Sequence, residues 1–236
     1  MRMTKTDGTL TRQRVLEAAL QLIDRDGLEG FSMRKLGAML GVEAMSLYNH
    51  VESKGALFDG VIEVLVLQAP YPEMSNATPY DELWAYIHTL RDVLRAHPRT
   101  LPLVATNPFR TPATLAVLDR LLATVYRANI HGIQAIYALQ SIAGFMIGQT
   151  LLDVGRTPVS GFEPGAAGPV VWQRFPAERY PALHAALPAI AQWSPDQEFD
   201  FGLQALFQSI FGGKVNVTRN TKTRQTKRRS TAGQVV

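Results

Sequence analysis

The stretch MRKLGAMLGVEAMSLYNHV, residues 33–51, has the pattern of two short helices joined by a tight turn. Gly37 and Ala38 are small enough to let two helices cross closely, and Gly41 can adopt the positive φ that the turn requires. Val42 and Leu47 are placed to pack the second helix onto the first. The spacing is that of a helix-turn-helix, but a simple helical hairpin has the same pattern, so both interpretations stay open here.

The second helix of this stretch leaves one group of side chains facing outward, away from the packed side. The outward residues are Ala44, Met45, Ser46, Tyr48, Asn49 and His50. If the stretch binds DNA, these are the side chains that face the groove.

Helical periodicity continues on both sides of the motif. Residues 11–26 form a predicted helix between Thr11, a suitable N-cap, and Gly27, which can end the helix in a left-handed conformation. Ser32 and Ser53 are suitable N-caps for helices at 33–40 and 54–68, with a short helix at 44–49 between them. Within 33–40, the residues expected to face inward are Leu36, Met39 and Leu40.

The chain after residue 68 is also predicted to be helical. The residues APYP at 69–72 and the polar stretch up to 79 indicate a linker. Further helices are expected at 80–96, 101–106, 112–129, 132–154 and 195–211, with a shorter one near 182–192. The Gly- and Pro-rich run at 155–176 is expected to be a loop or lid. The prediction is an all-α fold with a helix-turn-helix domain (1–68), a second helical domain (69–213) and a basic, disordered tail (214–236).

Composition places the chain among globular proteins and narrows its chemistry. Of 236 residues, 46% are hydrophobic and 19% are charged, which is enough apolar material for a core. The absence of cysteine excludes disulfides and thiolate metal sites. No uninterrupted apolar run reaches the roughly 20 residues of a membrane span, and no signal region follows the N-terminus, so we expect a cytoplasmic protein without membrane contact.

The net charge of +4 comes from the C-terminal tail. Residues 214–236 contain seven basic residues and no acidic one, so the rest of the chain is negative. The overall charge therefore gives no support to nucleic-acid binding, which has to be argued from the position of individual cations.

Catalytic motifs are absent from the sequence. The five histidines lack metal-ligand spacing, and neither a Gly-rich phosphate loop nor a Gly-x-Ser-x-Gly elbow occurs. His88 and Asp92 have the i, i+4 spacing of a surface contact on one helix. We therefore expect no enzyme activity, no cofactor and no metal.

The first quarter of the chain resembles the DNA-binding head of the Tet-repressor family. The resemblance extends from Val15 to Leu67 and includes the small-residue turn, the Leu-Tyr-x-His-Val run at 47–51, and Lys54 before a helix. The resemblance implies that Arg34 reaches a guanine edge or a phosphate and that Ala44, Met45 and Ser46 enter the major groove.

For the same head, the resemblance implies phosphate contacts from Tyr48, His50 and Lys54, with Lys54 beside the positive end of its own helix. Family members often have Gln and Pro where this chain has Ala44 and Met45. The operator sequence of this protein is therefore expected to differ from those of its relatives.

The second domain resembles the tetracycline-repressor subclass at 135–153 and 199–213. In that subclass these two helices pair with their copies as a four-helix bundle, which implies a homodimer on a palindromic operator. The apolar residues available for such pairing, or for an ordinary core, are Ile136, Leu139, Ile142, Ala143, Ile147, Leu151, Leu203, Leu206, Phe207 and Ile210.

The resemblance also bears on the ligand. Counted without gaps from 135–153, the subclass's magnesium ligands fall at Ala105 and Leu152, and two polar drug contacts fall at Ile87 and Leu121. None of these side chains binds a hard cation, so an apolar or aromatic effector without metal is expected. Other residues expected to line the same site are Arg91, Phe109, Met146 and Trp172.

The leading hypothesis is thus a dimeric repressor that a small apolar or aromatic effector releases from DNA. Two alternatives stay open: a DNA-binding regulator without an effector, and a small-molecule carrier with a vestigial head. The linker near Pro70 and Pro72 and the helix at 54–68 are the expected levers between effector and head.

Overall fold

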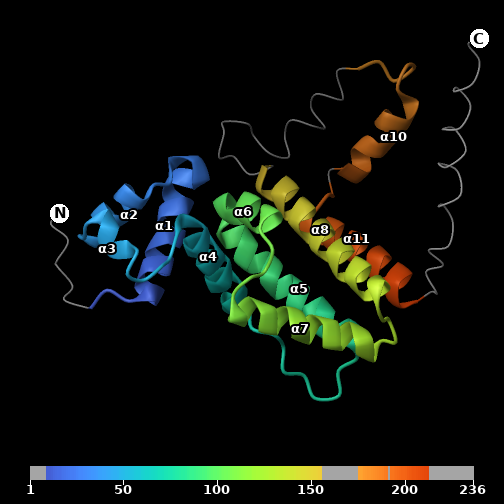
Figure 1. Ribbon diagram of the computed structural model, residues 1–236. Coiled ribbons are helices and arrows are strands. Elements are labelled where there is room, and N and C mark those ends of the chain that lie inside the picture. The colour runs from blue at the N-terminus through green and yellow to red at the C-terminus, as the bar shows by residue number, and fades with distance from the viewer. Residues whose placement is uncertain (1–8, 156–174, 191, 213–236) are drawn as a thin grey trace, which may run out of the picture.

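The computed structural model describes residues 9–155, 175–190 and 192–212, and within these ranges the chain forms helices joined by loops and turns, without a strand. Helices α1 to α4 form a head at one end, and the remaining helices form a larger body beside it (Figure 1). The predicted all-α fold is confirmed.

The head begins with α1 (Arg12–Gly30) and continues through α2 (Met33–Leu40), α3 (Ala44–Leu47) and α4 (Lys54–Gln68). Thr11, Ser32 and Ser53 each accept a hydrogen bond from a backbone N–H of the helix that follows, as their residue types predict. Gly41 ends α2 in the left-handed region, with φ 71° and ψ 29°.

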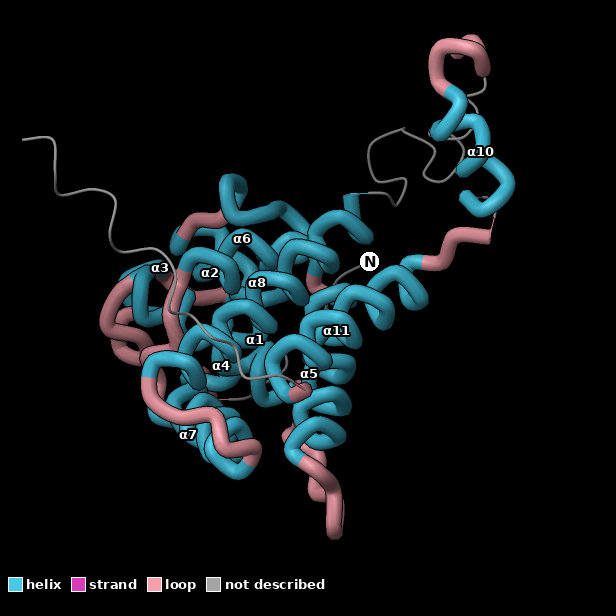
Figure 2. The backbone as a smooth tube through the Cα atoms, turned by 90° about the vertical axis from the view of Figure 1, so that its right-hand side faces the viewer, coloured by secondary structure: helices cyan, strands magenta, loops and turns pink. Residues whose placement is uncertain are grey.

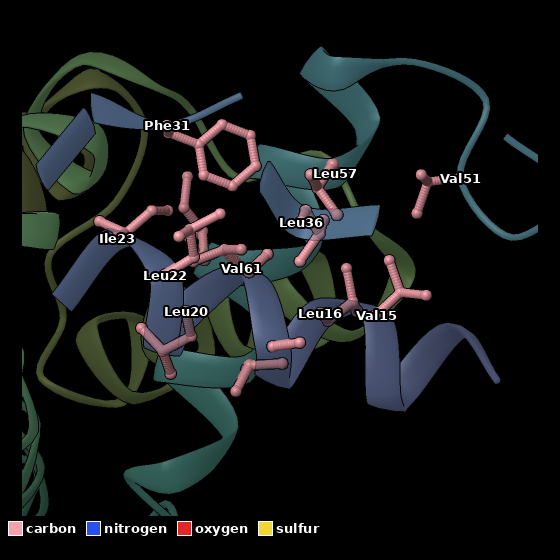
Figure 3. Packing of buried hydrophobic residues seen from close by; sticks show 14 of the residues in the cluster. Val15, Leu16, Leu20, Leu22, Ile23, Phe31, Leu36, Val51, Leu57 and Val61 are labelled. Carbon is pink, nitrogen blue, oxygen red and sulfur yellow. The ribbon is translucent and has the colours of Figure 1, made fainter. Parts of the chain in front are cut away.

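Two glycines let the head helices approach closely. A Cβ at Gly37 would lie 2.8 Å from the Val42 carbonyl oxygen, and one at Gly60 would lie 2.4 Å from a methyl of Leu16. Gly37 therefore allows the α2–α3 contact and Gly60 the α1–α4 contact. Figure 3 shows Leu22, Leu36 and Val61 gathered between the helices, with the Phe31 ring at the edge of this core.

The body starts with α5 (Pro79–Ala96) after an extended linker. The 3-10 helix η1 (Pro98–Thr100) leads into α6 (Leu101–Thr106), and α7 (Pro112–Arg127) and α8 (Ile133–Gly155) follow. The last helices are α10 (Pro181–Ile190) and α11 (Pro195–Phe211). In both views α10 stands apart from the other helices (Figure 2).

Aromatic rings join α5 to α8 and α11. Tyr80 and Trp84 on α5 meet Phe207 edge-on, with ring centroids 5.0 and 5.8 Å away, and Phe145 on α8 packs on Phe199. Such edge-to-face pairs stabilise a core beyond the area they bury. The same stretch of α11 carries Gly202, where a Cβ would collide with the Phe145 ring.

Helix α8 has the length and apolar character of a membrane span, 22 residues with mean hydropathy 1.4. Polar residues such as Gln140 and Gln149 interrupt this helix, so it is not an uninterrupted apolar run. The helix packs against α5, α7 and α11 within the body, and 28% of its apolar window is buried among the described residues.

Three local expectations need correction. Gly27 has the expected positive φ, 74°, but its ψ of 172° lies outside the left-handed helical region, and α1 continues past this kink to Gly30. Met39 is 40% exposed instead of facing inward, because a helix of eight residues buries only the side that Leu36 and Gly37 occupy. Helix α3 ends at Leu47, with turns up to His50.

Two buried apolar clusters divide the described residues near the predicted boundary at 68. The first contains α1–α4 residues up to Val66, and the second begins at Ala69. Leu103 of α6 belongs to the first cluster, so the body contributes a side chain to the core of the head. The residue limits of the domains stay a prediction, and the predicted tail and most of the predicted loop at 155–176 lie outside the described residues.

Candidate nucleic-acid interface and the interior of the body

Helix α3 presents the side chains that the sequence pattern places outward. Met45 is 75% exposed, Tyr48 and Asn49 are exposed, and Ala44, Ser46 and His50 are half-buried. Leu47, between them, is fully buried and fixes the orientation of the helix. The structure thus brings the whole predicted set together on one short helix and the turn after it.

The cations of the head differ in how they are compensated. Lys35 on α2 pairs with Asp26 at 3.1 Å and donates a hydrogen bond to the Gly30 carbonyl at 2.8 Å. Hydrogen bonds from Arg25, and then from Lys35, lower the pKa of Asp26 to about 2. Lys35 therefore interacts with groups of the head itself, whereas the neighbouring Arg34 is exposed at the start of α2.

Lys54 is exposed at the first position of α4, and its ammonium lies over two aromatic rings. Its Nζ is 5.5 Å from the centroid of the Phe31 ring and 5.3 Å from that of Phe58. The rings attract the cation without neutralising it. The two rings thus hold the Lys54 ammonium in place for the predicted phosphate contact.

The head is joined to the body near η1. His97 Nδ1 lies 2.7 Å from the Asp24 carboxylate on α1, and its Nε2 lies 3.3 Å from the Gln68 side chain at the end of α4. Arg99 donates to the backbone carbonyl of Arg25. This joint connects α5 to both long helices of the head and lies beside η1.

In the body, some of the predicted effector residues share the buried interior. Ile87 on α5 and Met146 on α8 are buried in the second cluster, and Leu121 on α7 packs against it. The same cluster contains Tyr86, 1% exposed, whose hydroxyl has no hydrogen-bond partner among the described residues. Burial raises the pKa of Tyr86, so the hydroxyl keeps its proton and is a donor at neutral pH.

Arg91 is buried in an ion network where α5, α8 and α11 meet. Its two terminal nitrogens donate to Asp196 at 2.8 Å and to Asp153 at 2.7 Å, and its guanidinium lies 4.1 Å from the Phe199 ring centroid. Arg95 also pairs with Asp196 at 2.8 Å. Of the three guanidinium nitrogens of Arg91, Nε is the one without a hydrogen-bond partner among the described residues. Arg91, predicted as an effector contact, is thus mostly engaged with the protein itself.

The other predicted effector residues lie elsewhere. Ala105 is exposed in the last turn of α6, and Leu152 is 52% exposed near the end of α8. Phe109 packs against the core of the head. Counting along the sequence gives a residue number but does not show which face of the helix the side chain occupies. Ala105 and Leu152 therefore fall outside the buried interior. Trp172 lies outside the described residues.

No group of three or more histidine, aspartate or glutamate side chains in the described residues is arranged to hold a metal ion. The expected His88–Asp92 contact is replaced by His88–Asp200, with 3.2 Å between the His88 Nε2 and the carboxylate. The metal-free effector site stays a prediction.

Two sequence-family models match the chain. The model described as "Bacterial regulatory proteins, tetR family" matches residues 15–61, and that described as "Tetracyclin repressor-like, C-terminal domain" matches residues 71–210. The chain belongs to the TetR family. It is therefore a DNA-binding transcriptional repressor and not an enzyme, and the resemblance noted between Val15 and Leu67 is confirmed.

Individual TetR-family relatives agree with this assignment. The class D tetracycline repressor of Escherichia coli is 41% identical over 212 residues, 89% of this chain and 91% of that protein. An HTH-type transcriptional regulator of Saccharopolyspora erythraea is 31% identical over 147 residues, 62% of each chain. The crystal structure of ActR from Streptomyces coelicolor with actinorhodin has a TM-score of 0.76 at 22% identity, over 87% of this chain and 98% of that one, which shows the shared fold.

Sequence reasoning missed Tyr86 and the His97–Asp24 joint. Tyr86 lies three residues after Leu83, which is the spacing of residues on one buried helix face. A hydroxyl group on that apolar face could have identified Tyr86 as a candidate. His97 and Asp24 are 73 residues apart, and no local pattern links them.

Proposed function

We propose that this TetR-family protein acts in the cytoplasm as a homodimer, binds a palindromic operator through α2 and α3, and is released by an apolar or aromatic effector bound in the body. The proposal for the head is supported by the exposed set on α3 and by two exposed cations, Arg34 and Lys54. Ser46 would read base edges, and Lys54 would bind a phosphate.

The dimer proposal is supported by exposed apolar side chains on α8 and α11, two helices that also pack on each other. The most exposed of them are Ile133, Tyr137, Leu151 and Phe201, the last at 78%. A second copy would cover these residues, and Phe201→Glu should then shift the protein to monomer in sedimentation.

The effector proposal depends on one observation, the buried and unpartnered hydroxyl of Tyr86. Buried polar groups almost always have a partner, so this donor is suited to an acceptor on a bound molecule. Its cluster includes Ile87, Met146 and Leu121, which are apolar. They favour a flat, largely apolar compound that carries a carbonyl or phenolic oxygen. The ActR structures with actinorhodin and with (S)-DNPA show such a fold holding small molecules.

Release requires that the effector prefer the body conformation in which the heads are wrongly spaced, because equal affinity for both states shifts nothing. The joint at His97 and the contacts of α4 with α5, α6 and α7 offer the mechanical route.

The test has two stages. Selection from random duplexes should enrich a palindrome, and a thermal-shift screen in EDTA should then identify aromatic ketones or phenols, with actinorhodin as one probe, that release this duplex. Leu121→Glu should abolish release and keep operator affinity. A magnesium-dependent tetracycline response would overturn the metal-free effector. Operator binding without any responding compound would favour the effector-free regulator, and the failure to enrich a palindrome would favour the carrier.

A further inference from the structure

We propose that Phe31 and Phe58 form an aromatic cradle that positions the Lys54 ammonium for a DNA phosphate. The cradle consists of these two rings, whose centroids are 5.3 Å apart with planes inclined by 58°. The proposal deepens the proposed function, because it rests on the phosphate contact of Lys54.

The geometry gives the ammonium two attractive surfaces at once. Nζ lies 5.5 and 5.3 Å from the two ring centroids, within the roughly 6 Å at which a cation is attracted to a ring face. Phe58 lies four residues after Lys54 on α4, so both side chains share one helix face. Phe31 is fixed at the other side, since it is 5% exposed and caps the end of α1.

A free lysine side chain loses much rotamer entropy when it binds a phosphate. The cradle removes part of that loss in advance, because it holds the ammonium before DNA arrives. Rings do not neutralise the charge, whereas the carboxylate of Asp26 compensates Lys35 nearby. Among the described residues of the head, Lys35 thus forms an ion pair within the protein, whereas Lys54 is held over aromatic rings and oriented for a partner.

The cradle also links two parts of the head. Phe31 stands directly before Ser32, the N-cap of α2, and Lys54 directly follows Ser53, the N-cap of α4. The ammonium is therefore placed relative to the start of α2, where Arg34 lies. A phosphate bound by Lys54 would hold the head in register with the duplex for α3.

The experiment measures binding of the full-length protein to a duplex of random sequence, about three helical turns long, over a salt series by fluorescence anisotropy. This probe is independent of operator and effector, so failure of the cradle can be told from failure of the repressor proposal. Lys54→Ala should lower the salt slope by about one unit. Phe58→Leu, which keeps an apolar side chain in the core, should weaken binding roughly two- to five-fold.

The double variant decides whether the ring acts through the lysine. In the Lys54→Ala background, Phe58→Leu should have no further effect on affinity, whereas a merely structural ring would weaken both backgrounds equally. Phe58→Tyr keeps the ring face and should bind as the native protein does, and Lys54→Arg should also retain affinity.

Two results would overturn the proposal: unchanged or tighter binding by Phe58→Leu, or equal losses in both backgrounds. Should Phe58→Leu lower the melting temperature, the Phe58→Tyr and Lys54→Arg variants decide the question instead, because retained affinity in both supports the cradle and loss of affinity in either contradicts it.

Discussion

The head and the body have different interiors. The buried cluster of the head is apolar, whereas every fully buried polar or charged residue in the described chain lies in the body. These residues are Arg91, Thr100, Thr114, Thr124 and Thr150. The difference suits the two tasks, because a purely apolar core holds a reading helix in one geometry, and buried polar groups within an otherwise apolar interior can exchange internal partners for a ligand.

The largest effect is expected where the body buries a charge. Arg91→Ala removes the 2.7 Å ion pair with the Asp153 carboxylate, which is 8% exposed, and should lower the free energy of unfolding by about 3 kcal/mol. Arg95→Ala is the comparison variant, since Arg95 is 37% exposed, its 2.8 Å partner Asp196 is 65% exposed, and its contact with Asp153 is longer, at 3.7 Å. That change should cost less than about 1 kcal/mol. Equal losses in urea unfolding would contradict the burial argument.

In the head, the largest expected effect is steric. Gly37→Ala places a Cβ 2.8 Å from a backbone oxygen, which cannot move aside as the end of a flexible side chain can. The free energy of unfolding should therefore fall by roughly 1–3 kcal/mol. Gly55→Ala, where the new Cβ has only an ordinary contact at 3.5 Å, should be neutral or slightly stabilising. Circular dichroism during thermal unfolding would compare them. A stable Gly37→Ala protein would show that the α2–α3 crossing is looser than described.

The joint between head and body should give a smaller effect on stability and a larger one on coupling. His97→Ala removes the contacts with Asp24 and Gln68, and half-buried groups of this kind contribute about 1 kcal/mol. Operator affinity should change little, but an effector should release the operator less completely. Complete release in this variant would assign the coupling to α4 and the linker alone.

The smallest effect concerns pH. The pKa of Asp26 is lowered to about 2 by Arg25 and Lys35, so its ion pairs stabilise the head fully above about pH 4 and lose this contribution as the pH falls towards 2. Asp26→Asn should therefore be less stable than the native protein at neutral pH, and the two should converge near pH 2. A constant difference across this range would exclude the Asp26 carboxylate as its source.

The head could be predicted from sequence in more detail than the body. Its turn, its helix caps and its outward-facing side chains depend on local sequence patterns. Gly41 after α2 and Ser53 before α4 are examples, and each pattern can be recognised within a few residues. The body depends on contacts between distant residues, as Arg91 with Asp196 and His97 with Asp24 illustrate. Of the positions counted along the chain, Ile87 is buried and Leu121 packs against the same cluster, whereas Ala105 and Leu152 are exposed.

The most direct test of a ligand-responsive body is Tyr86→Phe, which removes the unpartnered hydroxyl and nothing else. The unliganded protein should be as stable as the native one or more stable by about 1 kcal/mol, because no hydrogen bond is lost and a buried polar group is removed. The strongest binder from the EDTA screen should bind this variant about ten-fold more weakly, as expected for one lost hydrogen bond of about 1.4 kcal/mol. Lower stability together with unchanged ligand affinity would contradict the role of Tyr86 as a ligand donor.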